Sequence, residues 1–184
     1  MNLDSIIQYS KDLVKANLPE FNHLVHHLPE VEKWAKKILK EYPDADSEIV
    51  LASVWLHDIG QITGDKSIDH AISSEEFVLK TLPSIIGSSD KISQIAHCVR
   101  THRCKDIQPE TLEAKILTIS DSLSHMTDYV YIDYFQDGRI DEALEKVERD
   151  YHDKSLLDLS FKDKIDDLYK NWKLLLISLK KVDD

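Results

Sequence analysis

The stretch SEIVLASVWLHDIG, from Ser47 to Gly60, decides the fold of this 184-residue chain. Asp46 or Ser47 can cap a helix at its start, and the residues from Ile49 to Leu56 are apolar on nearly every side of that helix. A helix with this pattern must be buried all round, so we place it at the centre of the molecule. It delivers the pair His57-Asp58 at its end, where Gly60 is expected to stop the helix.

The rest of the chain also has the apolar period of about 3.6 residues that is typical of helices. Only 4 Gly and 5 Pro are present, and no repeat or linker divides the chain. We therefore predict an all-α fold with a single domain over residues 1–184, in which C-terminal helices of residues 140–182 pack on the core. The other expected helices cover residues 4–17, 27–42, 70–82, 90–101, 111–128, 141–151 and 161–182, and a loop covers residues 61–69.

The charge balance narrows the choice of partners. There are 23 Lys and Arg residues against 34 Asp and Glu, which gives a net charge of -11. This average field repels polymeric nucleic acid and an anionic membrane surface, although a bound metal can still attract a small phosphorylated molecule. The longest aliphatic run, Leu174 to Ile177, is too short to span a bilayer. We expect a cytoplasmic protein without a membrane or nucleic-acid partner, and a homo-oligomer is left open.

Several of the nine histidines fall at predicted helix ends or on apolar stripes. A lone histidine there is more often a hydrogen-bonded core residue than a ligand. The pair His57-Asp58 changes that balance, because a carboxylate at the end of an apolar helix is costly unless it meets a cation or hydrogen-bond donors. Imidazole and carboxylate together suit Mn, Fe, Co, Ni or Zn. Two adjacent residues cannot complete the coordination of a metal ion. The candidates for the remaining ligands are His27, on the apolar stripe of its helix, and Asp121, inside an apolar stretch.

These residues, in the order His27, His57-Asp58 and Asp121, resemble the signature of the HD-domain metal-dependent phosphohydrolase superfamily. The run LHDIG from Leu56 to Gly60 is similar to the family's motif, and the resemblance extends over about residues 23–125. It implies a compact HD-domain-like helical bundle with a central metal site. In this bundle His27, His57, Asp58 and Asp121 would be metal ligands.

His27 has two histidine neighbours. It comes four residues before Val31 and therefore lies on the apolar face of the predicted helix, whereas His26 is rotated about 100° away. We expect His23 to lie before the helix, with its ring solvated or placed behind a ligand.

Two further histidines determine the predicted number of ions, which is one or two per chain. Superfamily members with two ions have additional histidines between the His-Asp pair and the last Asp, and His70 and His102 resemble them. Asp58 would then bridge two ions. In the alternative, His70 and His102 lie behind a single ion or transfer protons. Both interpretations stay open, and His97 and His125 are expected on the polar surface.

The resemblance implies a phosphoric ester hydrolase that uses metal-activated water on a small phosphorylated molecule, with a nucleotide favoured. The catalytic candidates are His57, Asp58, His70 and His102. Lys66 and Arg103 are the candidates for binding substrate phosphate, because a cation near the metal can neutralise the remaining phosphate oxygens. A glycine-rich phosphate loop is missing from the sequence, and Cys98 is expected in the core rather than as a nucleophile. Two alternatives remain: a dinuclear iron oxygenase with the same ligands, and a non-catalytic binding or sensor module on an HD scaffold.

Overall fold

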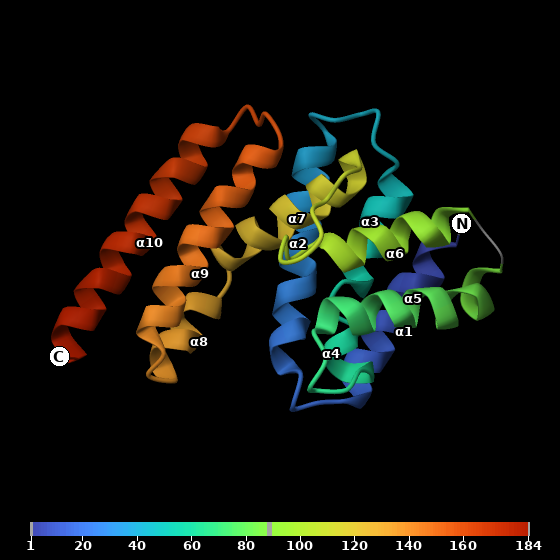
Figure 1. Ribbon diagram of the computed structural model, residues 1–184, viewed down its shortest axis with the longest axis horizontal. Helices are drawn as coiled ribbons and strands as arrows, with labels where there is room; N and C mark the ends of the chain where they lie inside the picture. The colour runs from blue at the N-terminus through green and yellow to red at the C-terminus, as the bar shows by residue number, and fades with distance from the viewer. Residues whose placement is uncertain (1, 88–89, 184) are drawn as a thin grey trace.

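The computed structural model describes residues 2–87 and 90–183. Within these two ranges it consists of helices and the segments that join them, without a strand (Figure 1). The predicted all-α fold is therefore confirmed. The α-helices are α1 (Leu3–Ala16), α2 (Asn22–Leu39), α3 (Ser47–Leu56), α4 (Gly60–Thr63), α5 (His70–Ile86), α6 (Lys91–Thr101), α7 (Leu112–His125), α8 (Val130–Gln136), α9 (Ile140–Asp153) and α10 (Lys162–Asp183), and a 3-10 turn, η1 (Lys154–Leu156), follows α9.

α3 is the central helix, as its apolar pattern predicts. It contacts α1, α2, α6 and α7, which together cover its sides. Val50, Val54 and Leu56 are fully buried there. The Asp46 carboxylate caps the start of α3 by accepting hydrogen bonds from the backbone N–H groups of Glu48 and Ile49. The end of α3 consequently lies in the interior, where its His-Asp pair faces neighbouring helices.

The helices around α3 bring distant parts of the chain to this end. α2 and α7 pack on each other, α6 packs on both α3 and α7, and α5 packs on α4 and α6 (Figure 1). The C-terminal helices continue the stack, because α9 packs on α7 and α10 packs on α9. The Trp172 indole N–H of α10 also donates to the backbone carbonyl of Met126 at 2.8 Å. The C-terminal helices thus pack on the core, while the assignment of residues 1–184 to one domain stays a prediction.

Two helices extend beyond their predicted ends, and each contains a proline, Pro29 in α2 and Pro83 in α5. α2 starts at Asn22, before Pro29, and α5 continues past Pro83 to Ile86. In α2 the buried residues Leu24 and Val31 lie on either side of the proline. Burial of a continuous apolar face offsets the hydrogen bond that a proline removes. Two short helices, α4 and α8, were not predicted at all.

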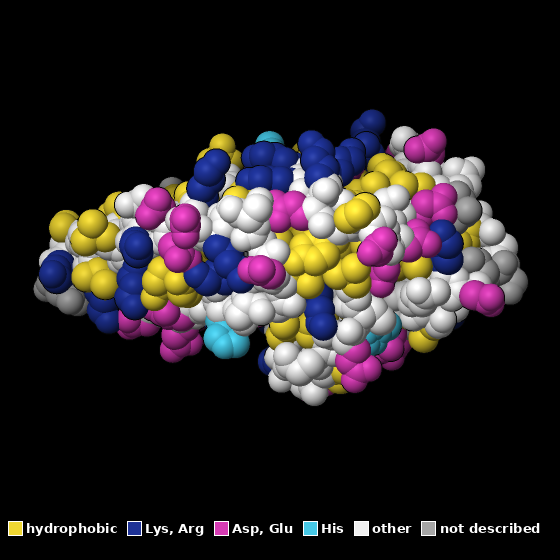
Figure 2. Space-filling model, turned by 90° about the horizontal axis from the view of Figure 1, so that it is seen from above, with side chains coloured by type: hydrophobic (Ala, Val, Ile, Leu, Met, Phe, Trp, Pro, Cys, Tyr) yellow, Lys and Arg dark blue, Asp and Glu magenta, His cyan; other side chains and the backbone are white. Residues whose placement is uncertain are grey.

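The surface is mixed in charge. Figure 2 shows Lys and Arg side chains interspersed with Asp and Glu over much of the face seen from above. Among residues 2–87 and 90–183, every helix is too short or too polar to cross a membrane.

Candidate metal centre

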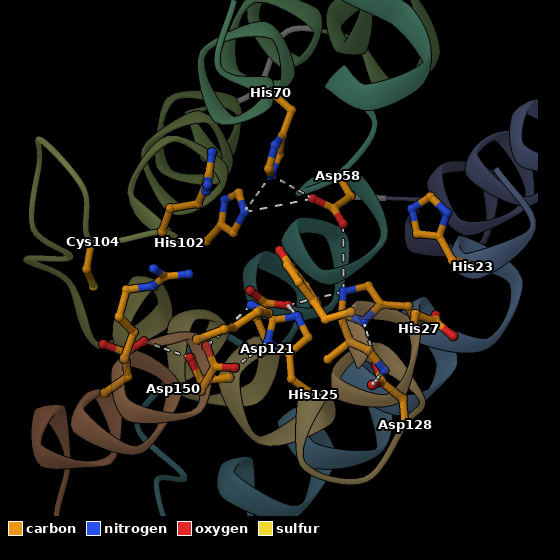
Figure 3. A pocket seen from close by; sticks show the side chains of 18 of the residues that line it. His23, His27, Asp58, His70, His102, Cys104, Asp121, His125, Asp128 and Asp150 are labelled. Carbon is orange, nitrogen blue, oxygen red and sulfur yellow. Dashed lines mark hydrogen bonds and ion pairs between the residues drawn. The ribbon is translucent and has the colours of Figure 1, made fainter. Parts of the chain in front are cut away.

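Asp58 lies between two sets of imidazole nitrogens. Its Oδ1 atom is 3.0 Å from His70 Nε2 and 3.9 Å from His102 Nε2. Its Oδ2 atom is 3.6 Å from His57 Nε2 and 3.7 Å from His27 Nε2. Figure 3 shows Asp58 with His70 and His102 on one side and His27 on the other. The two oxygens of one carboxylate therefore face two different pairs of histidines.

The first set is formed by His27 of α2, His57 at the end of α3 and Asp121 of α7. The two Nε2 atoms are 3.3 Å apart, and Asp121 Oδ1 is 3.1 Å from that of His27 and 3.5 Å from that of His57. All three side chains are buried. These three ligand atoms, from helices far apart in sequence, lie close enough together to hold one metal ion.

In His57 and His102 the other ring nitrogen has a partner that fixes the ring. His57 Nδ1 is 2.8 Å from the carbonyl oxygen of Val54, and His102 Nδ1 is 2.7 Å from that of Val99. A carbonyl only accepts, so each Nδ1 carries the hydrogen. In a neutral ring the Nε2 lone pair then points to the centre, which is the orientation that metal-ligating histidines have.

The electrostatics of the centre favour a positive charge. Although burial acts to lower it, the hydrogen bonds with Asp121 and Asp128 raise the pKa of His27 to about 10. Burial acts to raise the pKa of Asp58 and of Asp121, but the surrounding histidines hold both well below the usual range. Burial and the nearby His57 lower the pKa of His102 to about 3. A proton on His27 or a divalent cation can satisfy the two buried carboxylates, and the mixture of nitrogen and oxygen donors fits a transition metal.

The second set adds His70 and His102 to Asp58. The two Nε2 atoms lie 3.4 Å apart, and His102 forms a second potential metal group with His57 and Asp58. His70 is the first residue of α5, directly after Asp69, which caps that helix by accepting from the N–H of Ala71. All six residues that the sequence singled out as metal ligands are therefore brought together.

Gly60 explains how α5, which carries His70, comes close to the His57-Asp58 pair. We expected this glycine to stop α3, but α3 ends at Leu56 and Gly60 is the first residue of α4. A Cβ atom at Gly60 would lie 2.2 Å from the carbonyl oxygen of His70 and 2.6 Å from the amide nitrogen of Ser74. Ser74 Oγ accepts from the Gly60 N–H and donates to the carbonyl of His57. The missing side chain thus lets α5 pack directly on the His-Asp turn.

Two expectations about histidines are wrong. His125 is not on the polar surface: it is 8% exposed, and its Nε2 lies 3.4 Å from Asp121 Oδ1. His23 is not before the helix but within α2, where its Nε2 lies 3.0 Å from Gln61 Oε1. The position of His125, four residues after Asp121 on a buried helix, was the signal that could have identified it.

Two aspartates of the centre were not foreseen. Asp128 Oδ2 is 3.2 Å from His27 Nδ1, and Asp150 Oδ2 is 3.1 Å from His125 Nδ1. No local sequence pattern identifies either aspartate, because each contacts a histidine more than twenty positions away in the chain.

A pocket of about 1370 Å³ opens over the centre and is lined by candidate ligands together with residues of α8 and α9. Arg103 lines this pocket, and its guanidinium pairs with the Asp69 carboxylate at 2.6 Å. Lys66 lines a neighbouring hollow instead; its exposed side chain pairs with Glu20. Of the two phosphate-binding candidates, only Arg103 lies in the pocket of the metal centre.

These features define a helical protein with a buried His/Asp cluster that could hold a metal ion. The HD domain family model matches residues 24–126, and the chain belongs to the HD domain family. Its fold is similar to the crystal structure of a predicted HD superfamily hydrolase from an uncultured Thermotogales bacterium, with 17% sequence identity, coverage of 96% of this chain and 92% of that chain, and a TM-score of 0.64. At this identity the likeness concerns the fold alone. No curated protein sequence matches the chain.

Proposed function

We propose that this protein is a metal-dependent phosphohydrolase that acts on a small phosphorylated molecule, with a nucleotide favoured. HD superfamily proteins are commonly metal-dependent hydrolases, which supports the reaction class. The observation that carries the proposal is the position of Asp58, whose two oxygens face separate imidazole pairs at the bottom of a large pocket. A bound divalent metal supplies Lewis acidity and a water of lowered pKa for attack on phosphorus.

We assign the residues of the candidate metal centre the following roles. His27, His57, Asp58 and Asp121 would hold one ion, and His70 and His102 would complete a second site with Asp58. With a single ion, His70 is instead the best-placed proton donor for the leaving oxygen, because it is less buried than His102 and lines the pocket. Asp58 keeps its role as a ligand in both versions.

Basic side chains around the pocket support an anionic substrate. In a chain of net charge -11, the pocket is lined by Arg103, Lys105, Arg139, Lys146 and Arg149. Arg103 and Lys105 both pair with Asp69, which precedes His70 directly, so their charges are held next to the second set of ligands. A planar guanidinium in that position suits phosphate oxygens.

The wall of the pocket opposite the ligands favours a nucleotide. Tyr129 is 66% exposed, and Tyr134 carries the Arg139 guanidinium over its ring at 4.5 Å. Both tyrosines line the pocket together with Asp133 and Asp137. Exposed aromatic faces can stack on a planar base, and carboxylates can accept hydrogen bonds from its amino groups or from ribose hydroxyls.

The test measures phosphate release by metal-free protein reloaded with Mn²⁺, Co²⁺ or Zn²⁺. Nucleoside monophosphates are compared with sugar phosphates and p-nitrophenyl phosphate. We expect Asp58→Asn to lower kcat/KM at least about 100-fold, since it removes the negative charge that the two ligand sets share and replaces one of the two oxygens by an NH2 group. His97→Gln is the matched control and should keep wild-type activity, because His97 does not line the pocket. Undiminished hydrolysis by Asp58→Asn, or no hydrolysis of any phosphoester by the wild type, would contradict the proposal.

The same ligands also suit a dinuclear iron oxygenase, because a carboxylate between two histidine pairs fits two iron ions equally well. Oxygen uptake by the iron-loaded protein, without phosphate release from any ester, would favour this second candidate.

A further inference from the structure

A chain of buried polar contacts leads from α8 and α9 to the candidate metal centre. The Tyr131 hydroxyl donates to Asp150 Oδ2 at 2.7 Å, and the same oxygen lies 3.1 Å from His125 Nδ1. On its other side, His125 Nε2 lies 3.4 Å from Asp121 Oδ1. Figure 3 shows His125, Asp121 and Asp150 close together in the pocket. Tyr131 and Asp150 both lie beyond residue 126, where the match to the HD domain family ends.

The contacts are held in place by burial. Tyr131 is fully buried and Asp150 is 5% exposed, so neither can exchange its partner for bulk water. Burial, together with the neighbouring Asp150 carboxylate, raises the pKa of Tyr131, which therefore remains a hydrogen-bond donor. Although burial acts to raise it, the charges of His125 and Lys146 hold the pKa of Asp150 below its usual value. An ionised Asp150 only accepts, so His125 carries a hydrogen on Nδ1 and donates it to Asp150.

His125 touches two candidate ligands at once. Besides facing Asp121, its ring stacks on the His27 ring with centroids 5.2 Å apart and planes at 7°. His27 and Asp121 come from different helices, α2 and α7, so His125 helps to set the distance and angle between them. A histidine that only filled space in the core would not need a carboxylate at each ring nitrogen. His125 has Asp150 at Nδ1 and Asp121 at Nε2.

We propose that His125, held by Asp150 and Tyr131, is a positioning residue that orients Asp121 and His27 for metal binding. The C-terminal helices thereby contribute to metal affinity without supplying a ligand. The inference rests on the proposed metal site but not on the proposed reaction.

The experiment measures the dissociation constant for Mn²⁺ by isothermal titration calorimetry on metal-free protein. We expect Asp150→Asn and His125→Phe to weaken binding about 10- to 100-fold, the usual effect of losing a partner behind a ligand. Tyr131→Phe should weaken it several-fold. Tyr151→Phe is the matched control: it also removes a hydroxyl that faces a carboxylate, Asp166, but away from the centre, and should leave the affinity unchanged.

A combined variant separates positioning from general stability. Because the contacts act in series, Tyr131→Phe should have no further effect on Mn²⁺ affinity in the His125→Phe background, even if the two losses of thermal stability add. Mn²⁺ affinity within twofold of wild type in folded His125→Phe would overturn the inference. Should that variant not fold, an unchanged affinity in Asp150→Asn overturns it. Wild-type protein that binds Mn²⁺ but hydrolyses no phosphoester would reject the proposed reaction and leave the positioning role standing.

Discussion

Asp58 and Gly60 are two residues apart and have different roles in the candidate metal centre. Asp58 presents one carboxylate to two histidine pairs, and Gly60 removes the side chain that would keep α5, with His70, at a distance. The two atoms nearest to a Cβ at Gly60 are backbone atoms, the carbonyl oxygen of His70 and the amide nitrogen of Ser74, and Ser74 Oγ follows at 2.8 Å. A larger residue there must move α5 rather than a rotamer.

Gly60→Ala should therefore lower both stability and metal binding. We expect a loss of about 1–3 kcal/mol in the free energy of unfolding, measured by urea denaturation, because the methyl group overlaps backbone. Loss of metal per chain, measured by mass spectrometry, should accompany it as His70 is displaced. Gly138→Ala is the control: its positive φ makes that substitution unfavourable too, but nothing surrounds it. Equal metal content in Gly60→Ala and wild type would contradict this account.

The residues of the centre differ in how far the sequence could identify them. His27, the His57-Asp58 pair and Asp121 could be chosen because polar groups on apolar helices need a partner. His125 obeys the same rule, yet it was assigned to the surface, since the amount of cover that α9 provides for α7 cannot be read from a local pattern. Asp150 could not be found at all, because an aspartate on an exposed amphipathic helix looks the same whether or not a distant histidine meets it.

Whole helices were easier to predict than their ends. The apolar stretch of α3 determined its length and its central place. In contrast, Pro83 gave a false end for α5, because tertiary burial outweighed the local cost of proline, and α2 begins five residues before the predicted start at His27. α4 and α8, with four and seven residues, are too short for a helical period to show in sequence.

At the start of α3, Asp46 offers a test of capping and of pH dependence. Asp46→Ala should lower the free energy of unfolding by about 1 kcal/mol at pH 7, while Asp46→Asn, which can still cap, should cost less. Burial acts to raise the pKa of Asp46, but Lys91 and the N–H groups of Ile49 and Glu48 hold it below its usual value. A lowered pKa in the folded state means that this stabilisation is present above about pH 4 and is lost as the pH falls through the folded-state value. Urea unfolding of wild type and Asp46→Ala at pH 7 and pH 3 checks this. If the difference in the free energy of unfolding between the two proteins grew toward pH 3, the prediction would be wrong.

For the molecule as a whole, we expect a bound metal ion to raise the stability, because it would satisfy the buried carboxylates. At a free metal concentration of 100 times the dissociation constant, binding adds about 2.7 kcal/mol, which for a chain of this size corresponds to a melting temperature higher by about 5–10 °C. Chelation should reverse this shift in differential scanning calorimetry. Asp121→Asn, which weakens the first ligand set, should show a smaller difference than wild type between the melting temperatures with and without metal. Identical melting of metal-loaded and chelated wild type would argue against a resident ion.

The candidate ligands lie within or at the ends of five helices, from His27 of α2 to Asp121 of α7. No segment shorter than this span contains the first set, and loop closure over such a distance comes late in assembly. We therefore expect the first set to be able to hold an ion only after α7 has left the ribosome and packed on α2. Metal uptake at the first set would report the packing of α7, and a nascent chain that ends before residue 121 would lack that set, although His57, Asp58 and His102 of the second potential group are already present in it.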